Sequence, residues 1–410
     1  MRIKLSYRKI RGFFLGLTVI TIVFAGGYET AKYRLGQGSN KVINKFIGNP
    51  AQLQPQGADF ARFWDVWKRL EQSYVDPEQV NYQKMTWGAI QGLAQSLGDP
   101  YTQYLPPDDN KRVNEDLSGS FYGVGIELGY KDSTLVVVAP LAGTPAEKAG
   151  VQAGDFILHI KDEQKQVDVD TRGIALLDAV DKIRGPLGTP VILTLYREGV
   201  AESFEVTISR GEIVVPTIEV KYLDYAGKKY ALLQLHRFGG RTDNEWLEKV
   251  GEIEANKVAG VILDLRNNPG GYLDGAVFVA GEFLSSGAVV EQQGRNQNET
   301  YQVDRKGSLL GMPLVVLINK GSASASEITA GALQDHKRAK VVGETSFGKG
   351  TVQEVQEMSD GSSLHVTIAK WLTPEGKWIN KEGITPDVEA KDDPNTKDVD
   401  EVVEAALKQF

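Results

Sequence analysis

The chain contains no cysteine and only four histidines among its 410 residues. The absence of cysteine excludes a thiol nucleophile, disulfide bonds, thiolate metal ligands and a lipid-modified cysteine. The histidines are scattered and lack metal-ligand spacing such as His-x-x-x-His; they are His159, His236, His336 and His365. We therefore expect no metal and no organic cofactor.

A net positive charge is also missing, since 46 basic residues face 54 acidic ones and give a net charge of −8. This balance argues against a general nucleic-acid-binding protein. The apolar content of 41% and the charged content of 24% are those of an ordinary globular protein. The length allows two or three domains.

A basic N-terminus precedes an uncharged, mainly apolar stretch of 17 residues from Gly12 to Tyr28. This pattern predicts a signal peptide or a signal anchor over residues 1–28, at the short end for a membrane span. Val23-Phe24-Ala25 would allow cleavage, but the absence of Ala-x-Ala favours a single-pass anchor. Either interpretation places the rest of the chain outside the cytoplasm of a bacterial-type cell, at the membrane or secreted.

Residues 29–57 are polar and rich in Gly, Gln and Asn, which indicates a linker. Residues 58–117 follow as an N-terminal helical region. Apolar and aromatic residues recur there at helical spacing from Phe60 to Tyr74, and a second helix is predicted near Gln83–Leu97. We expect these aromatic side chains to be core residues. With a terminal helix over Asp398–Gln409, within residues 391–410, they are compatible with a homodimer.

Residues 118–210 form a predicted β-rich unit with a helix over Gly173–Arg184. The order of strands and helix, behind a glycine-rich entry strand, resembles a PDZ domain. That resemblance implies that a peptide C-terminus pairs with an edge strand. Its carboxylate and last residues would bind at one loop and strand start, which comprise Tyr122, Gly123, Val124, Gly125 and Ile126.

Residues 211–390 alternate between strand and helix patterns, typical of an α/β core. Leu314–Ile318 is a continuous apolar run and predicts a buried strand. A turn carrying Ser322, Ser324 and Ser326 follows, and then a helix ends near Asp335. A helix N-terminus offers unpaired N–H groups and a positive dipole end to an oxyanion, although serine there is more often only an N-cap.

Lys349 stands between Gly348 and Gly350 in a second turn. Glycines let the chain approach another backbone closely. A desolvated lysine has a lowered pKa and can act as the general base for a serine hydroxyl.

Taken together, Ser-Ala-Ser-Ala-Ser-Glu327, Gly-Lys349-Gly, Asp264-Leu-Arg-Asn-Asn-Pro-Gly-Gly271 and the PDZ-like unit resemble the carboxyl-terminal processing proteases. Asp99-Pro-Tyr-Thr102 also matches that family, and the resemblance covers roughly residues 60–390. It implies a multidomain α/β fold. A ClpP/crotonase-like protease core would carry an inserted PDZ domain and an N-terminal helical segment.

By the same resemblance, Ser324 is the nucleophile and Lys349, 25 residues later, is the general base of a serine endopeptidase. Gln353 would hold the lysine. The oxyanion donors would be the backbone N–H of Ala325 and that of Gly270 or Gly271. Lysine starts near pKa 10.4 and needs a depression of about 3 units to act at neutral pH; we expect neighbours such as Phe347 to bury it.

Ser322 and Ser326 are the rival nucleophiles; we expect Ser322 to cap the helix and Ser326 to point elsewhere. In the family the PDZ unit can gate activity, and Arg184 occupies the place of a residue that reports PDZ occupancy; the alternative is a surface arginine packed on a loop. An inert, membrane-anchored PDZ scaffold is the main competing function. A thioester or acyl hydrolase is a second, for which a PDZ-like unit has no obvious use.

Overall fold

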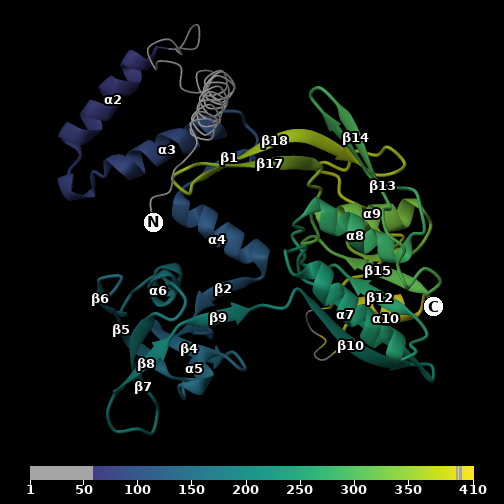
Figure 1. Cartoon of the computed structure of the whole chain (residues 1–410), viewed down its shortest axis with the longest axis horizontal. Coiled ribbons are helices and arrows are strands. Elements are labelled where there is room, and N and C mark those ends of the chain that lie inside the picture. Colours follow the sequence, from purple (N-terminus) through teal and green to yellow (C-terminus); the bar gives the residue numbers. More distant parts are fainter. Residues whose placement is uncertain (1–58, 394–395, 397–398) are drawn as a thin grey trace, which may run out of the picture. The chain divides into compact units, whose positions relative to one another are not determined.

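The computed structural model describes residues 59–393, 396 and 399–410. The predicted signal or anchor segment and most of the predicted linker lie outside this part of the chain. The chain divides into two compact units, residues 1–86 and 87–410. Figure 1 labels the elements of both units.

The described part of the first unit contains helix α2 (Phe60–Ser73), a 3₁₀ turn at Pro77–Gln79 and the beginning of helix α3 (Tyr82–Gln95). Both predicted helices are present. However, α2 has no buried residue, and Trp64 is 61% exposed. The expectation that its aromatic side chains form a core is wrong, because in the described chain they chiefly contact one another and Tyr82 of α3, on which Trp67 stacks with ring centroids 6.3 Å apart. Over the residues described, no helix is long and apolar enough to cross a membrane.

The core of the second unit is a six-stranded sheet in which only the first strand is antiparallel to its neighbour. Helices α7 (Thr242–Ala255), α8 (Leu273–Phe283) and α9 (Ala325–Asp335) cover one face, and α10 (Glu401–Leu407) covers the other. The strands, in spatial order, are β10 (Ile218–Tyr225), β11 (Lys228–Leu235), β12 (Val261–Asp264), β15 (Leu314–Ile318), β16 (Lys340–Gly343) and β19 (Val388–Glu389).

The central strands β12 and β15 are buried along their whole length. In β12, Val261 and Leu263 pack with α7–α9, whereas Ile262 packs with α10. A parallel strand covered on both faces needs apolar residues at every position, which explains the unbroken apolar runs in the sequence. The turn that contains Gly270 and Gly271 (the glycine turn) follows the carboxyl end of β12. The turn that contains Ser322, Ser324 and Ser326 (the serine turn) follows the carboxyl end of β15.

A second, antiparallel sheet is assembled from distant parts of the chain. Strand β18 (Ser363–Leu372) pairs on one side with β17 (Thr351–Glu357). On its other side it pairs with β1 (Gln103–Leu105) at one end and β13 (Ala288–Gly294) at the other, and β14 (Asn298–Gln302) extends β13. This pairing fixes the segment around residue 100 against the segment around residue 365.

Helix α4 (Pro107–Ser118) follows β1 and lies almost entirely within the predicted helical region 58–117, although no separate helix was predicted at its position. Its sequence is mainly polar and has no apolar periodicity from which a helix would be inferred. Helix capping is the available signal: Pro107 begins it, and Gly119 with φ 72° ends it.

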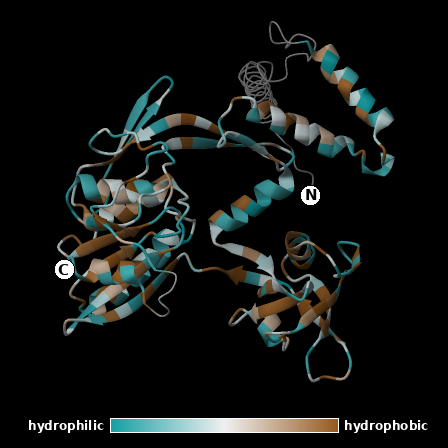
Figure 2. Ribbon diagram, turned by 180° about the vertical axis from the view of Figure 1, so that it is seen from behind, coloured by the Kyte–Doolittle hydropathy of each residue, from teal (hydrophilic) through white to brown (hydrophobic). Residues whose placement is uncertain are grey.

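The PDZ-like unit is a six-stranded antiparallel sheet with its own core, and its strands stand out as apolar in Figure 2. Helices α5 (Pro145–Lys148) and α6 (Leu176–Ile183) pack on it, and a ribbon of β2 (Ser120–Gly123) and β9 (Gly211–Val214) leads in and out. Its strands, in spatial order, are β3 (Ile126–Lys131), β4 (Thr134–Pro140), β5 (Phe156–Asp162), β7 (Pro190–Tyr196) and β8 (Phe204–Ser209), with β6 (Val167–Asp170) paired to β5.

Candidate active site

Ser324 lies in the turn between β15 and α9, where it is the N-cap residue of α9. Its backbone has φ 55° and ψ −115°, a conformation that residues other than glycine rarely adopt. Such strain persists only where the surroundings enforce it, and it is concentrated at functional sites. The side chain is partly exposed at the positive end of the helix dipole.

The two rival serines are fully buried and engaged. The Ser322 hydroxyl donates to the Leu265 carbonyl (2.8 Å) and accepts from the Asn319 N–H (2.9 Å). The expectation that Ser322 caps the helix is therefore wrong, because it braces the turn against β12 and leaves the cap position to Ser324. The Ser326 hydroxyl points away and donates to the Asn268 carbonyl (2.9 Å).

The glycine turn at 270–271 lies directly against the serine turn. A Cβ added to Gly270 would stand 2.9 Å from both the Ser324 Cβ and the Ala325 nitrogen. A Cβ on Gly271 would overlap the Phe238 carbonyl oxygen at 2.0 Å. Both positions have positive φ, so close approach and backbone conformation alike require glycine.

The two candidate oxyanion glycines differ in their hydrogen bonding. The Gly270 N–H donates to the Asn268 side-chain oxygen (2.9 Å). Within the described ranges, the N–H groups of Gly271 and Ala325 have no hydrogen-bond acceptor. These two donors are thus the ones open to a ligand in this conformation.

The Lys349 loop is held by close backbone approach, as its flanking glycines suggest. A Cβ on Gly348 would stand 2.9 Å from the Lys381 nitrogen, and one on Gly350 would stand 2.8 Å from the Asn380 nitrogen. The Lys349 carbonyl accepts from the Trp371 indole N–H (2.8 Å). The loop is thereby fixed between β18 and the segment that follows it.

Burial lowers the pKa of Lys349, and the negative charges of Asp99 and Glu327 oppose that change. The aromatic side chain beside the amine is Tyr101, whose ring centroid is 4.9 Å from Nζ. The expectation that Phe347 buries the lysine is wrong, because Phe347 is 54% exposed. The direction of the pKa change is the one that a general base requires.

Glu327 is a site residue that sequence reasoning missed. Its fully buried carboxylate accepts from the N–H groups of Ser324 (2.7 Å), Gly348 (2.5 Å) and Lys349 (2.9 Å), and from the Ser346 hydroxyl (2.6 Å). One carboxylate therefore joins the serine turn to the lysine loop. The available signal was Ser324-Ala-Ser-Glu327, the spacing of a capping box.

Gln353 lies on β17, and its side-chain amide donates to the hydroxyls of Thr351 (3.0 Å) and Thr367 (3.2 Å). The described residues show no hydrogen bond from Gln353 to Lys349, and none between the Ser324 hydroxyl and the Lys349 amine. The structure thus brings the backbones of Ser324 and Lys349 together, while their side chains are not hydrogen-bonded.

In the PDZ-like unit, β3 is an edge strand and α6 packs beside it, the arrangement that β-augmentation needs. Ile126 begins β3. Tyr122 and Gly123 instead pair with β9, so the connecting loop is only Val124 and Gly125. Gly125 has φ 79° and packs against Thr144.

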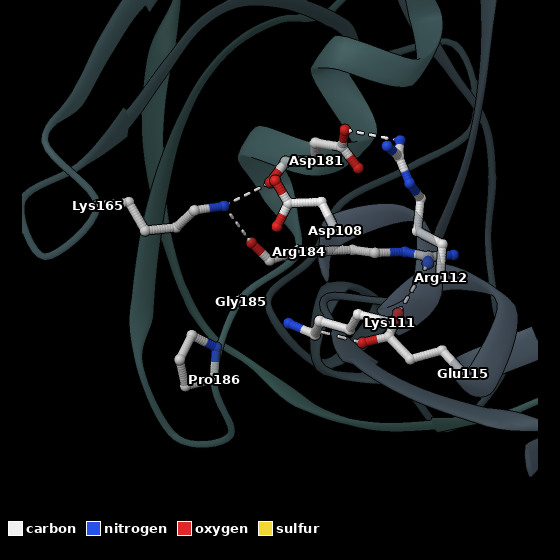
Figure 3. Close-up of a pocket in the computed structure, with 9 residues that line it drawn as sticks. All are labelled: Asp108, Lys111, Arg112, Glu115, Lys165, Asp181, Arg184, Gly185 and Pro186. Atoms are coloured by element: carbon white, nitrogen blue, oxygen red, sulfur yellow. Dashed lines mark hydrogen bonds and ion pairs between the residues drawn. The ribbon is translucent and has the colours of Figure 1, made fainter. Parts of the chain in front are cut away.

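Arg184 follows α6 and links the PDZ-like unit to α4. Its guanidinium forms an ion pair with Glu115 (3.1 Å) and stacks on the Phe121 ring at 3.8 Å. A second ion pair joins Arg112 of α4 to Asp181 of α6 (2.9 Å), as Figure 3 shows. The four charged residues of these two ion pairs line a cavity of about 340 Å³ between α4 and the PDZ-like unit.

Comparison with known proteins assigns the chain to a family. The chain matches the models of peptidase family S41 over residues 229–390, of the PDZ domain over 136–197, and of the activating protease CtpB N-terminal domain over 20–109. A carboxy-terminal-processing protease of Bartonella bacilliformis is 41% identical over 335 residues, spanning 80% of this chain and 74% of that protein. The chain belongs to the carboxy-terminal processing proteases of family S41.

Further relatives support the same assignment. The carboxy-terminal processing protease CtpA of Bacillus subtilis is 36% identical over 329 residues, which span 79% of this chain and 68% of that protein. A solved protein of Bacteroides fragilis assigned to the S41 proteases shares the fold with a TM-score of 0.52 at 16% identity, covering 87% of this chain and 98% of that one. Membership of the family makes this chain a serine-type peptidase with a multidomain α/β fold, as the sequence predicted.

Proposed function

We propose that the chain is a serine endopeptidase that cleaves proteins near their C-termini, with Ser324 as nucleophile and Lys349 as general base. The observation that carries this proposal is the carboxylate of Glu327, which accepts from the backbone N–H groups of both residues. The same carboxylate holds a strained serine at a helix N-terminus beside the loop of a partly buried lysine with a lowered pKa.

In the proposed reaction, neutral Lys349 accepts the Ser324 proton while the serine oxygen attacks a peptide carbonyl. The oxyanion is held by two backbone N–H groups, each contributing about 3 kcal/mol to transition-state stabilisation. Ala325 and Gly271 are the favoured donors, because the Gly270 N–H already donates to Asn268. Protonated Lys349 then delivers the proton to the leaving amine, and water hydrolyses the acyl-enzyme.

Gln353 has a positioning role in this proposal. In the present conformation its amide is bound to Thr351 and Thr367, and the dyad side chains are not hydrogen-bonded to each other within the described chain. Closing the dyad therefore requires a side-chain rearrangement. This observation fits an enzyme that is gated rather than always active.

The PDZ-like unit would bind apolar, uncharged C-termini of substrate proteins along β3 and control that rearrangement. Arg184 supports this proposal, because its ion pair with Glu115 and its stacking on Phe121 connect the PDZ-like unit to α4, which continues from β1 of the antiparallel sheet. Substituting Arg184→Ala should change cleavage of a substrate with a PDZ-binding tail relative to an untailed one. Equal effects on both substrates would contradict gating through Arg184.

The decisive test compares the purified chain from about residue 40 with its Ser324→Ala and Lys349→Ala variants on a peptide ending in apolar residues. We expect cleavage by the unsubstituted chain and none by either variant. Ser322→Ala is the matched control and should retain cleavage if it folds. Equal turnover by all variants would contradict the proposed roles of Ser324 and Lys349 and would favour the competing function, an inert PDZ scaffold.

We also propose that the enzyme acts outside the cytoplasm of a bacterial-type cell, anchored by its N-terminal segment. The basic residues before Gly12–Tyr28 support this proposal. Externally added protease should degrade the catalytic region in cells with a permeabilised outer surface and an intact cytoplasmic membrane. Complete protection under these conditions would contradict it.

A further inference from the structure

Tyr101 presents its ring to the amine of Lys349, with Nζ 4.9 Å from the ring centroid. Within the described chain, the amine has no ion pair and no hydrogen bond from its side chain. The charge of the amine is therefore influenced by the ring face of Tyr101 and by the negative charges of Asp99 and Glu327, neither of which forms an ion pair with it. Aromatic faces attract ammonium groups, most strongly where water is excluded.

The loop that carries Tyr101 is rigidly built. The Asp99 carboxylate accepts from the Thr102 hydroxyl (2.7 Å) and from the Tyr101 N–H (3.1 Å). The Thr102 hydroxyl in turn accepts from the Thr367 N–H on β18 (3.1 Å). Thr102 is buried, and β1 directly after it pairs with β18.

This loop thereby contacts Lys349 directly and is linked to Gln353 through Thr367. Thr367, which holds Thr102, also accepts the side-chain amide of Gln353 (3.2 Å). Tyr101 reaches the amine of Lys349 itself. A segment some 250 residues earlier in the chain than the base thus completes the surroundings of the base.

The chemistry of the reaction gives this arrangement a use. As the Ser324 O–H bond breaks and the oxygen–carbon bond forms, the proton moves to the Lys349 nitrogen lone pair and creates an ammonium ion in a partly buried place. That ion persists until the proton passes to the leaving amine. Groups that stabilise it lower the barrier of the step, as a carboxylate does for the imidazolium of a serine–histidine enzyme.

We propose that Tyr101 and Asp99 are positioning residues of the catalytic base, whose ring face and negative charge stabilise the Lys349 ammonium formed during attack. This inference rests on the proposed roles of Ser324 and Lys349. It adds a third segment to the dyad, outside both the serine turn and the lysine loop.

Two other titratable groups influence the same amine. Glu327 of α9 contributes negative charge, but its carboxylate is already occupied by four donors. His365 of β18 has its pKa lowered by burial and by the charge of Lys349, so it is neutral at neutral pH. Burial lowers the pKa of Lys349, whereas Asp99 and Glu327 raise it; removing Asp99 should lower it further.

The experiment titrates Lys349 directly in the full-length chain, through the rate of its acetylation by acetic anhydride at a series of pH values, read by mass spectrometry. The variants are Tyr101→Leu, Tyr101→Phe and Asp99→Asn, with His365→Gln as a control. The pH dependence of kcat/KM on a peptide substrate is measured beside it. Because acetylation does not need proteolysis, failure of the proposed function and failure of this inference are distinguishable.

We expect Tyr101→Leu and Asp99→Asn to move the acetylation midpoint and the acid limb of kcat/KM to lower pH. The plateau of kcat/KM should fall roughly tenfold. Tyr101→Phe keeps the ring face and should behave as the unsubstituted enzyme, and His365→Gln should leave the midpoint in place. Melting temperatures identify any variant that fails to fold.

Lower activity with an unchanged midpoint in both Tyr101→Leu and Asp99→Asn would show a merely structural role and overturn the proposal. A midpoint that moves to higher pH would also overturn it. If Tyr101→Leu does not fold, Asp99→Asn alone decides, since asparagine keeps an oxygen that can accept from the Tyr101 N–H.

Discussion

The serine turn and the lysine loop reach the same site by different physical means. The serine turn is held by side chains: the hydroxyls of Ser322 and Ser326 donate to the carbonyls of Leu265 and Asn268, which follow β12, in buried hydrogen bonds. The lysine loop is built by the absence of side chains, since two glycines let its backbone press against residues 378–383. The first arrangement fixes one oxygen in a strained place, and the second leaves a long side chain free to move.

Glu327 is the point where the two arrangements meet, and replacing it should have the largest effect. Glu327→Gln removes the charge and sets an NH₂ group among four donors, so buried N–H groups lose their acceptor at about 1–3 kcal/mol each. We expect peptidase activity to fall at least about 100-fold and the melting temperature to drop. Steady-state kinetics and calorimetry would check this.

The control for that variant is Glu344→Gln. Among the residues that the structure describes, the side chain of Glu344 forms only long, partly exposed ion pairs, to Lys320 (3.6 Å) and Lys391 (3.9 Å). The substitution should change neither activity nor stability measurably. If Glu327→Gln behaves like this control, the carboxylate does not join the two segments functionally.

Gly350→Ala tests the lysine loop alone. The added Cβ would stand 2.8 Å from Asn380 and from the Trp378 indole nitrogen, so the loop must shift. We expect a loss of about 1–3 kcal/mol in the free energy of unfolding and a reduced kcat. Gly251→Ala is the matched control, because nothing lies within 4 Å of that Cβ in α7, and it should be neutral or stabilising. Chemical denaturation of both variants measures the difference.

Ser326→Ala tests the serine turn alone. Its hydroxyl donates to the Asn268 carbonyl, which keeps a second donor in the Ala323 N–H. The free energy of unfolding should therefore decrease by only about 1 kcal/mol. Cleavage should persist, as Ser326 is not the proposed nucleophile. If a folded Ser326→Ala variant no longer cleaves the substrate, the assignment of Ser324 as the nucleophile is contradicted.

The smallest effect is expected for Phe347→Ala. More than half of this side chain is exposed, so the change in unfolding free energy should stay within about 0.5 kcal/mol. The acid limb of the pH–rate profile should also stay in place, because Tyr101 and not Phe347 lies at the amine. A shift of that limb, measured from pH 6 to 10, would restore the original expectation.

The same contrast explains what the sequence could predict. The strand, turn and helix around Ser324 are local, and the strand Leu314–Ile318 was predicted with its observed bounds because it is a continuous apolar run. The choice of Lys349 as the general base came from the family resemblance. By contrast, the approach of Tyr101 depends on β1 pairing with β18, a long-range contact that no local pattern encodes.

Other misses have local causes. Three alternating serines look alike in sequence. Only the structure shows that the Ser322 hydroxyl bonds to the Leu265 carbonyl and that Ser324 is the N-cap residue of α9. The polar helix α4 lacks apolar periodicity. The aromatic side chains of α2 were expected in a core because helical spacing shows an amphipathic face but not what covers it.

The pairing of β1 with β18 also bears on when the enzyme becomes able to cut. The proposed site combines residues near position 100 with others near positions 270, 324, 349 and 367, so almost the whole chain must be synthesised before the site exists. During translation an unfinished chain has no complete catalytic centre. A chain that ends before β18 therefore lacks both the partner strand of β1 and the Thr367 contacts of the proposed site.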